Sequence, residues 1–254
     1  MKIRAIALNT FKEAIKDRIL YLVFFFAAVC LIFSRLLALL TVGDQVKIIT
    51  DVGLAAISLF GTFMAILIGT GLVYKEIDKK TIFTLLSKPI HRYQFLLGKF
   101  FGLILTLLVM ILLMTVIFLL MLFVHTIQIE WRMFVVISLI FFELALITSV
   151  AILFSTFSTP ILSSVFTLAF YLIGHFSWGL ETLIAKIQSR FLKTSAEVLY
   201  TLLPDLENFN YKTEIVHSLP IPDKVILLSF LYGIVYTAFV LAVAMFIFRK
   251  RDFI

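Results

Sequence analysis

The sequence predicts an all-α membrane protein with six transmembrane helices in one domain that spans residues 1–254. Three observations support this prediction: a high apolar content, few charges, and six long apolar stretches. Hydrophobic residues make up 62% of the 254 residues and charged residues only 15%, whereas a soluble domain has roughly 45–50% apolar and about 25% charged residues. Because a soluble fold of this size buries only part of its surface, the excess apolar surface has to face lipid.

Each of the six apolar stretches is long enough for the roughly 20 helical residues that cross a hydrocarbon core. They cover residues 19–40, 52–73, 98–124, 134–157, 161–180 and 225–248. The third is the cleanest, since it has no charge from residue 100 to residue 124. Pro160 separates the fourth from the fifth, and proline suits the first turn of a helix because its missing N–H costs no hydrogen bond there.

The distribution of Lys and Arg predicts that both termini are cytoplasmic. With the N-terminus inside, the cytoplasmic side has 14 of the 22 basic residues and 5 of the 15 acidic ones, and the other side has 8 and 10. Such an excess of basic residues is typical of cytoplasmic loops. The chain is therefore predicted to lie in the inner membrane among lipid. The net charge of +7 does not indicate nucleic-acid binding, because the basic residues flank apolar runs.

Two further pieces do not span the membrane. Residues 1–18 place Ile3, Ile6 and Phe11 at helical spacing with Lys12 and Lys16 elsewhere on the wheel, a pattern typical of an amphipathic helix in the membrane interface. Residues 181–224 form the largest external segment. We expect an amphipathic helix near 183–200 and then irregular chain at 203–210, where Asp205 and Glu207 are interpreted as part of a turn. This segment could also contact a periplasmic or extracellular protein.

The cytoplasmic loop at 74–95 is the most informative part of the chain. Its charges are concentrated at the start, an apolar set that includes Leu85 follows, and Pro89 ends any helix because a proline restricts the residue before it. For an arbitrary membrane protein a solvated loop is one interpretation. The other is a short amphipathic helix that docks on a cytosolic partner, with apolar anchors and carboxylates that find basic groups.

The loop resembles the first cytoplasmic loop of ABC-2 type transporter permeases. The resemblance lies in the succession Glu-Ile-Asp, Thr-Ile, Leu-Leu-Ser-Lys-Pro-Ile, Arg and Leu-Leu-Gly-Lys between residues 76 and 99. It extends to the basic N-terminal helix, the six spans, Leu-Phe-Ser-Thr-Phe at 153–157 and the basic C-terminus. Within the family the chain looks closest to the six-span group called multicopper-enzyme maturation permeases. It departs from the usual pattern at Lys80, where the family often has glycine.

The resemblance implies a transport subunit that pairs with a second permease, identical or related, and with two copies of a cytosolic ABC ATPase. The loop would be the coupling helix. Glu76 and Asp78 would form ion pairs with the ATPase, Ile82 and Leu85 would be apolar anchors, and Ser87 to Pro89 would set the exit into the third span. The implied ATPase-coupling residues are Glu76, Asp78, Thr81, Ile82, Leu85, Ser87, Pro89 and Arg92. Export is expected by analogy.

The chain is not expected to be an enzyme. It has no G-x-x-x-x-G-K-[ST] motif for ATP, no G-x-S-x-G and no H-E-x-x-H. We therefore expect no cofactor in this chain, with ATP and Mg bound by the partner ATPase. The four histidines have no i, i+4 pair and the one cysteine, Cys30, lies in an apolar run, so no metal site is predicted.

The candidate functional or packing residues inside the predicted spans are of three kinds. Glu143 lies deep in the fourth span, where a carboxylate costs about 2.5–3.5 kcal/mol on insertion scales. Two interpretations of Glu143 remain open: it lines a substrate path or subunit contact, or it makes a structural hydrogen bond. His175, in the fifth span, is open to the same two interpretations, with packing favoured. Gly98 and Gly102 open the third span and let helices approach closely, within the subunit or between subunits.

An ATP-independent secondary transporter or channel remains the alternative. Such proteins tend to show inverted repeats, broken helices or several charges inside the membrane. Here no repeat is visible and Glu143 is the one charge deep in a predicted span. An intramembrane enzyme acting on lipid is a further class, and it would need a polar cluster at one interface that the sequence does not reveal.

Overall fold

The computed structural model describes residues 2–16, 45–78, 91–125, 130–176, 203–217 and 219–250, together with isolated positions between them. Every regular element in these residues is a helix, which confirms the all-α prediction. The elements are α1 (Lys2–Lys16), α3 (Gln45–Asp78), α5 (Arg92–Val124), α6 (Trp131–Ser155), α7 (Pro160–His175), the 3₁₀ helix η1 (Leu206–Phe209), α10 (Lys212–Val216) and α11 (Asp223–Lys250).

Four of these helices are long and apolar enough to cross a membrane: Val46–Gly71 within α3, and the whole of α5, α6 and α11. They correspond to the second, third, fourth and sixth predicted spans, so the chain is a polytopic membrane protein. Each is predicted within a few residues of its observed bounds, except that α3 and α5 extend further at one end or both. The predicted first span, 19–40, has only isolated described residues.

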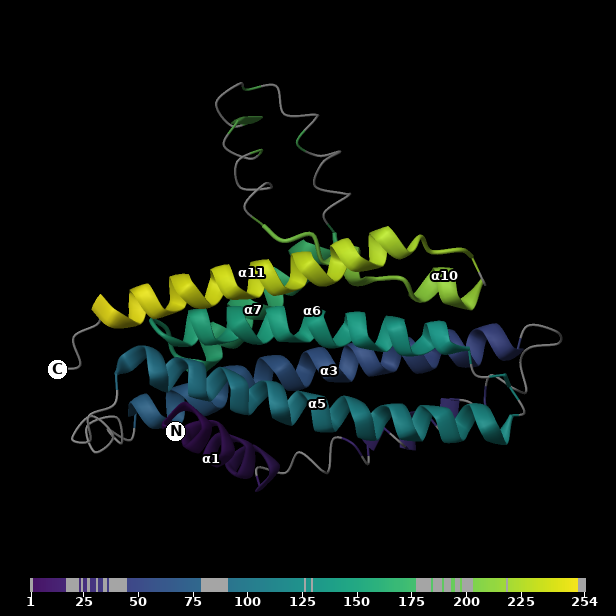
Figure 1. The fold of residues 1–254 in the computed structure, drawn as a ribbon, viewed down its shortest axis with the longest axis horizontal. Coiled ribbons are helices and arrows are strands. Elements are labelled where there is room, and N and C mark those ends of the chain that lie inside the picture. Colours follow the sequence, from purple (N-terminus) through teal and green to yellow (C-terminus); the bar gives the residue numbers. More distant parts are fainter. Residues whose placement is uncertain are drawn as a thin grey trace.

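The long helices lie side by side along the long axis of the molecule, and α1 lies across one end of them (Figure 1). The last turns of α11, the first turns of α5 and the end of α3 lie at this same end, which we call the α1 end. The short helix α10 lies toward the opposite end, which we call the α10 end. The core runs between α3, α5 and α6 and includes the fully buried side chains of Leu54, Met114, Phe118, Leu144 and Ile147.

Helix α1 packs closely on the first turns of α5. A Cβ at Gly98 would lie 2.7 Å from Ile6 Cβ, and a Cβ at Gly102 would lie 2.6 Å from both the Ala7 carbonyl oxygen and Thr10 Cβ. Small residues at this spacing allow such an approach between helices. Within the described part of the chain, the close packing at Gly98 and Gly102 is thus a contact between α1 and α5.

Helix α7 is the short member of the bundle. Its 16 residues span about 24 Å at 1.5 Å per residue, less than the roughly 30 Å of a hydrocarbon core. The fifth span was predicted to run to residue 180, but the described helix ends at His175, and 177–180 lie outside the described residues. The segment 203–210, which returns to the bundle at this point, packs against the end of α7 and against α6.

Candidate functional site

A buried carboxylate lies at the centre of the bundle. Glu143 is the middle residue of the 25 in α6, so it stands about 18 Å from either end of that helix. Its side chain is 0% exposed. An isolated ionised carboxylate is costly at this depth, so Glu143 and the groups that contact it are a candidate functional site.

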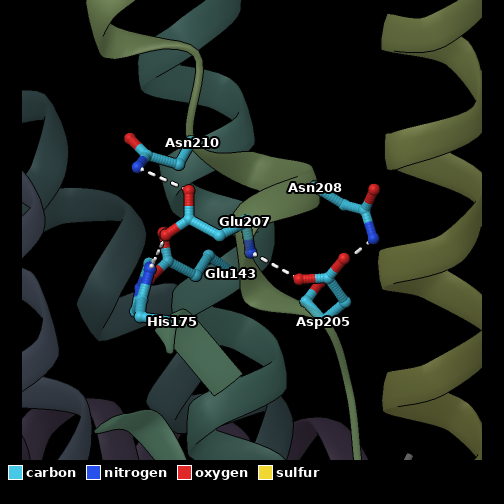
Figure 2. A network of polar contacts seen from close by, with 6 residues as sticks. All are labelled: Glu143, His175, Asp205, Glu207, Asn208 and Asn210. Carbon is cyan, nitrogen blue, oxygen red and sulfur yellow. Dashed lines mark hydrogen bonds and ion pairs between the residues drawn. The ribbon is translucent and has the colours of Figure 1, made fainter. Parts of the chain in front are cut away.

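His175, the last residue of α7, lies between Glu143 and a second carboxylate (Figure 2). Its Nε2 is 2.9 Å from Glu143 Oε1, and its Nδ1 is 3.0 Å from Glu207 Oε1. The rings of Tyr171 and His175 also contact each other edge to face, and their centroids are 4.6 Å apart. We call Glu143, His175 and Glu207 the Glu–His–Glu cluster.

Glu207 belongs to η1, the 3₁₀ turn of the segment 203–210. The Asp205 side chain accepts a hydrogen bond from the Glu207 backbone N–H at 3.2 Å, which caps this turn. Asn210 Nδ2 donates to Glu207 Oε2 at 2.9 Å. Both oxygens of Glu207 are therefore held, and they face His175 and Asn210 as Figure 2 shows. The predicted turn at Asp205 and Glu207 is present, and it carries a contact with His175 that the prediction missed.

Two apolar side chains seat η1 in the bundle. Leu206 and Phe209 are both 0% exposed and pack with Leu139, Leu146 and Val150 of α6 and Val240 of α11. Leu206 and Phe209 fit because the residues that face them, on α7 and α11, are glycines without a side chain. A Cβ at Gly174 would lie 2.6 Å from Leu206 Cγ, and a Cβ at Gly233 would lie 3.0 Å from Phe209 Cε1.

Polar contacts hold the same segment to α11. The Asp205 backbone N–H donates to the Tyr232 hydroxyl at 2.9 Å, and the Tyr211 and Ser229 hydroxyls are 3.2 Å apart. An open hollow of about 500 Å³ lies beside this contact, lined by Asn208 and by α11 residues that include Ser229, Tyr232 and Tyr236. The segment thus carries polar groups and irregular backbone to the depth at which α6 has its midpoint.

Several buried oxygens near the cluster have no hydrogen-bond partner among the described residues. They include Glu143 Oε2 and the hydroxyl oxygens of Ser58 and Thr62 on α3. Tyr171 lies beside Ser58, Thr62 and Glu143. Buried polar atoms without partners are uncommon, so this side of Glu143 is suited to ordered water.

The geometry does not resemble a metal site. The carboxylates contact opposite nitrogens of one imidazole ring, and within the described residues no three His, Cys, Asp or Glu side chains are placed to hold a metal ion. The arrangement can bind and transfer protons, because the His175 imidazole connects the partly exposed carboxylate of Glu207 to the buried carboxylate of Glu143. Glu207 is 38% exposed, His175 15% and Glu143 0%.

The predicted coupling loop is described only at its two ends. The backbone of Glu76 and Asp78 continues α3, and their side chains are not described. Thr81, Ile82, Leu85, Ser87 and Pro89 lie outside the described residues. Arg92 is described, and its guanidinium donates to the Phe248 carbonyl at 3.3 Å and to the Arg249 carbonyl at 3.0 Å. Its described contacts therefore link the first turn of α5 to the last turn of α11.

A second link at the α1 end joins α5 to α1. Lys99 is 1% exposed, and its Nζ lies 3.6 Å from Glu13 Oε2. Together with the packing at Gly98 and Gly102, this ion pair makes α1 and the start of α5 one unit. An open hollow of about 550 Å³ lies next to it, lined by His91, Arg92, Tyr93, Met245, Phe246 and Arg249.

The sequence pointed to Glu143 and His175 separately and did not pair them. His175 is 32 residues from Glu143 and also 32 residues from Glu207, and no local pattern connects positions so far apart. The one signal that could have indicated Glu207 is the helix-breaking run around Pro204, because irregular backbone in a membrane protein has to be buried in protein or face water.

Comparison with known families supports a transport role. The family described as ABC-2 family transporter protein matches residues 4–253, nearly the whole chain. The match is to the family and does not distinguish the multicopper-enzyme maturation group. Among curated proteins, none matches this chain.

Proposed function

Since this chain belongs to the ABC-2 transporter family and is a membrane permease component, we propose that it is an exporter subunit driven by a separate cytosolic ATPase. ATP hydrolysis takes place in that partner, which also binds ATP and Mg. The family match carries the proposal. The loop at 74–95 is the proposed contact with the ATPase, and two permease subunits with two ATPase subunits form the working unit.

The helices at the α1 end support this role for the loop. The loop leaves α3 at Asp78 and enters α5 at Arg92, so a force on the loop acts directly on α5. Arg92 passes the displacement to α11, and the ion pair of Lys99 with Glu13 passes it to α1. A partner that tilts the loop would therefore move three helices together, which suits a permease that alternates between two conformations.

The charges at the α1 end support a cytoplasmic location for it. Lys12 and Lys16 on α1 are exposed, and Arg249 and Lys250 end α11 at the same side of the bundle. Basic residues flank the cytoplasmic ends of membrane helices. We therefore place both termini in the cytoplasm and the chain in the inner membrane. The hollow lined by His91, Arg92 and Arg249 would then face the partner.

The segment 203–210 supports a polar path through the other half of the bundle. Non-helical backbone at membrane depth is tolerated only where it is buried in protein or lines water. Here Leu206 and Phe209 are buried, while Glu207 and Asn208 are partly exposed. We propose that the exposed side of this segment lines the route of the substrate toward the outside.

Co-purification from detergent-solubilised membranes tests the proposal. We expect an ABC ATPase to accompany the wild-type chain and to be lost from the Glu76→Lys, Leu85→Asp double variant, because the variant reverses a charge and places a charge on an apolar anchor. The matched control is Leu219→Asp, Lys224→Glu. It makes the same kinds of change at exposed positions near the α10 end, and it should retain the ATPase.

Two results would count against coupling through the loop. If the ATPase is retained by the loop variant while both variants insert into the membrane equally well, another surface makes the contact. If no ATPase accompanies the wild-type chain in several mild detergents, an ATP-independent transporter becomes the better explanation.

A further inference from the structure

The Glu–His–Glu cluster has a proton requirement that follows from its hydrogen bonds. Ionised carboxylates only accept hydrogen bonds, and a neutral imidazole has one donor nitrogen. With Glu143 Oε1 at 2.9 Å from Nε2 and Glu207 Oε1 at 3.0 Å from Nδ1, a neutral ring could donate to only one carboxylate. The second contact needs one more proton, either on the ring or on a carboxyl group.

We propose that the Glu–His–Glu cluster is a proton-binding site whose bound proton holds the segment 203–210 against the middle of α6 and the end of α7. The structure corresponds to the protonated state, in which both contacts are hydrogen bonds. When the proton leaves, a lone pair of the ring faces a carboxylate oxygen. That contact becomes repulsive, and one of the two carboxylates has to move away.

The two carboxylates differ in their freedom to move. Glu143 is fully buried in the middle of a regular helix that α3, α5 and α11 surround. Glu207 is 38% exposed and belongs to a four-residue 3₁₀ turn. The Glu207 side is therefore the one that separates, and it is also the side through which a proton enters or leaves. Deprotonation should release η1 and expose Leu206, which is otherwise buried against Gly174.

The other groups around the cluster are compatible with this assignment. Tyr171 on α7 contacts the ring, and Ser58 and Thr62 on α3 lie beside Tyr171. On the segment itself, Asn210 donates to Glu207, while Asp205 caps the turn and its backbone N–H contacts Tyr232 of α11. Glu214, a carboxylate on α10, has one buried oxygen without a hydrogen bond among the described residues. The Asp205 carboxylate, which accepts a hydrogen bond from the Glu207 backbone N–H, adds negative charge beside the cluster, and this favours the protonated state.

Thiol accessibility at position 206 tests the proposal in the full-length chain reconstituted in lipid nanodiscs. The reporter is Leu206→Cys in a chain that also carries Cys30→Ala. Its labelling rate by a charged maleimide is measured from about pH 5 to about pH 9, an interval that includes the range of about pH 5–8 in which an unperturbed histidine changes charge. The comparison protein carries Glu207→Gln in addition. There the new amide can donate to a neutral ring, so the contact needs no extra proton.

We expect the ratio of the two labelling rates, reporter over comparison protein, to rise severalfold with pH, because the reporter opens and the comparison protein stays closed. Dividing the rates removes the pH dependence of the thiol itself. A ratio that stays constant over the whole range would overturn the proposal.

Hydrogen–deuterium exchange covers the case in which the cysteine variants do not fold. Exchange of residues 203–211 in the unmodified chain, corrected for the intrinsic pH dependence of exchange, should increase with pH and should not increase in the Glu207→Gln variant. Equal behaviour of the two proteins would overturn the proposal. The outcome does not depend on an ATPase, so this inference and the proposed function fail separately.

Discussion

The α1 end and the Glu–His–Glu cluster are both places where separate helices are tied together, and they are built in different ways. At the α1 end, regular helices meet through glycines four residues apart and through an ion pair between the buried Lys99 and the partly exposed Glu13. At the cluster, a helix end, a helix centre and a short turn meet through an imidazole that lies between a fully buried carboxylate and a partly exposed one. The first contact depends on shape and the second on charge and protons, so they should respond differently to substitution.

The largest expected effect is at the cluster. His175→Ala leaves the Glu143 carboxylate buried without its one described partner, and breaking a buried ionic contact typically costs about 3–5 kcal/mol. We expect a loss of that size in the free energy of unfolding, measured by SDS-induced unfolding in mixed micelles. His217→Ala is the control, because His217 is exposed and its loss should change stability by less than about 0.5 kcal/mol. Equal losses in the free energy of unfolding for the two variants would mean that the cluster contributes no more to stability than an exposed histidine does.

The next effect concerns shape at the α1 end. Gly102→Ala adds a Cβ that would lie 2.6 Å from the backbone oxygen of Ala7, so α1 has to shift. We expect a destabilisation of about 1–3 kcal/mol, as for overpacked cores, and faster proteolysis at the exposed lysines of α1. Gly71→Ala is the matched control, since a Cβ there has no neighbour within 4 Å. Unchanged proteolysis of the Gly102 variant would show that the α1–α5 packing is not tight.

A smaller effect is expected for the link between α5 and α11. Arg92→Gln removes the charged donor to the carbonyls of Phe248 and Arg249. A typical intramolecular hydrogen bond contributes about 1 kcal/mol, and the exposed setting of the bond to Arg249 keeps the expected loss near that value. Faster hydrogen exchange in the last turn of α11, with no change at its first turn, is the expected result. If coupling runs through this contact, ATPase stimulation by substrate should also fall. Exchange that rises along the whole of α11 would indicate general unfolding instead.

The smallest effect is expected for Glu13→Gln. Its partner Lys99 is buried, but Glu13 itself is 36% exposed and the Nζ to Oε2 distance is 3.6 Å, so solvent screens the pair. We expect a change below about 1 kcal/mol in the free energy of unfolding, and a smaller difference between wild type and variant in high salt. A loss as large as that of His175→Ala would remove the distinction drawn between the two regions.

The sequence predicted most of the fold because membrane helices have a strong local signal. Roughly 20 consecutive apolar residues are needed to cross lipid, and four of the six stretches that meet this rule became α3, α5, α6 and α11. It was less successful for α7, where the apolar run continues past the described helix end at His175. Hydropathy does not report a helix end that lies against protein, here against Leu206 and the Pro204 carbonyl oxygen.

The site was predictable only in parts. Glu143 attracted notice because a carboxylate in a span is costly, and Gly98 and Gly102 because of their spacing. The pairing of Glu143 with His175 and Glu207 was not predictable, since each contact joins residues 32 positions apart. Roles at Glu76, Asp78 and the rest of the coupling loop stay predictions that the co-purification experiment tests.

The sequence by itself determined that this chain is a helical membrane protein of the ABC-2 family, because apolar run length and local motifs are properties of neighbouring residues. Only the tertiary structure decided that α1 packs on α5, that α7 ends beside the midpoint of α6, and that His175 lies between two carboxylates. These contacts depend on where separate helices stop and cross. In lipid, where apolar surface alone does not favour one helix partner over another, close packing and buried polar groups make that choice.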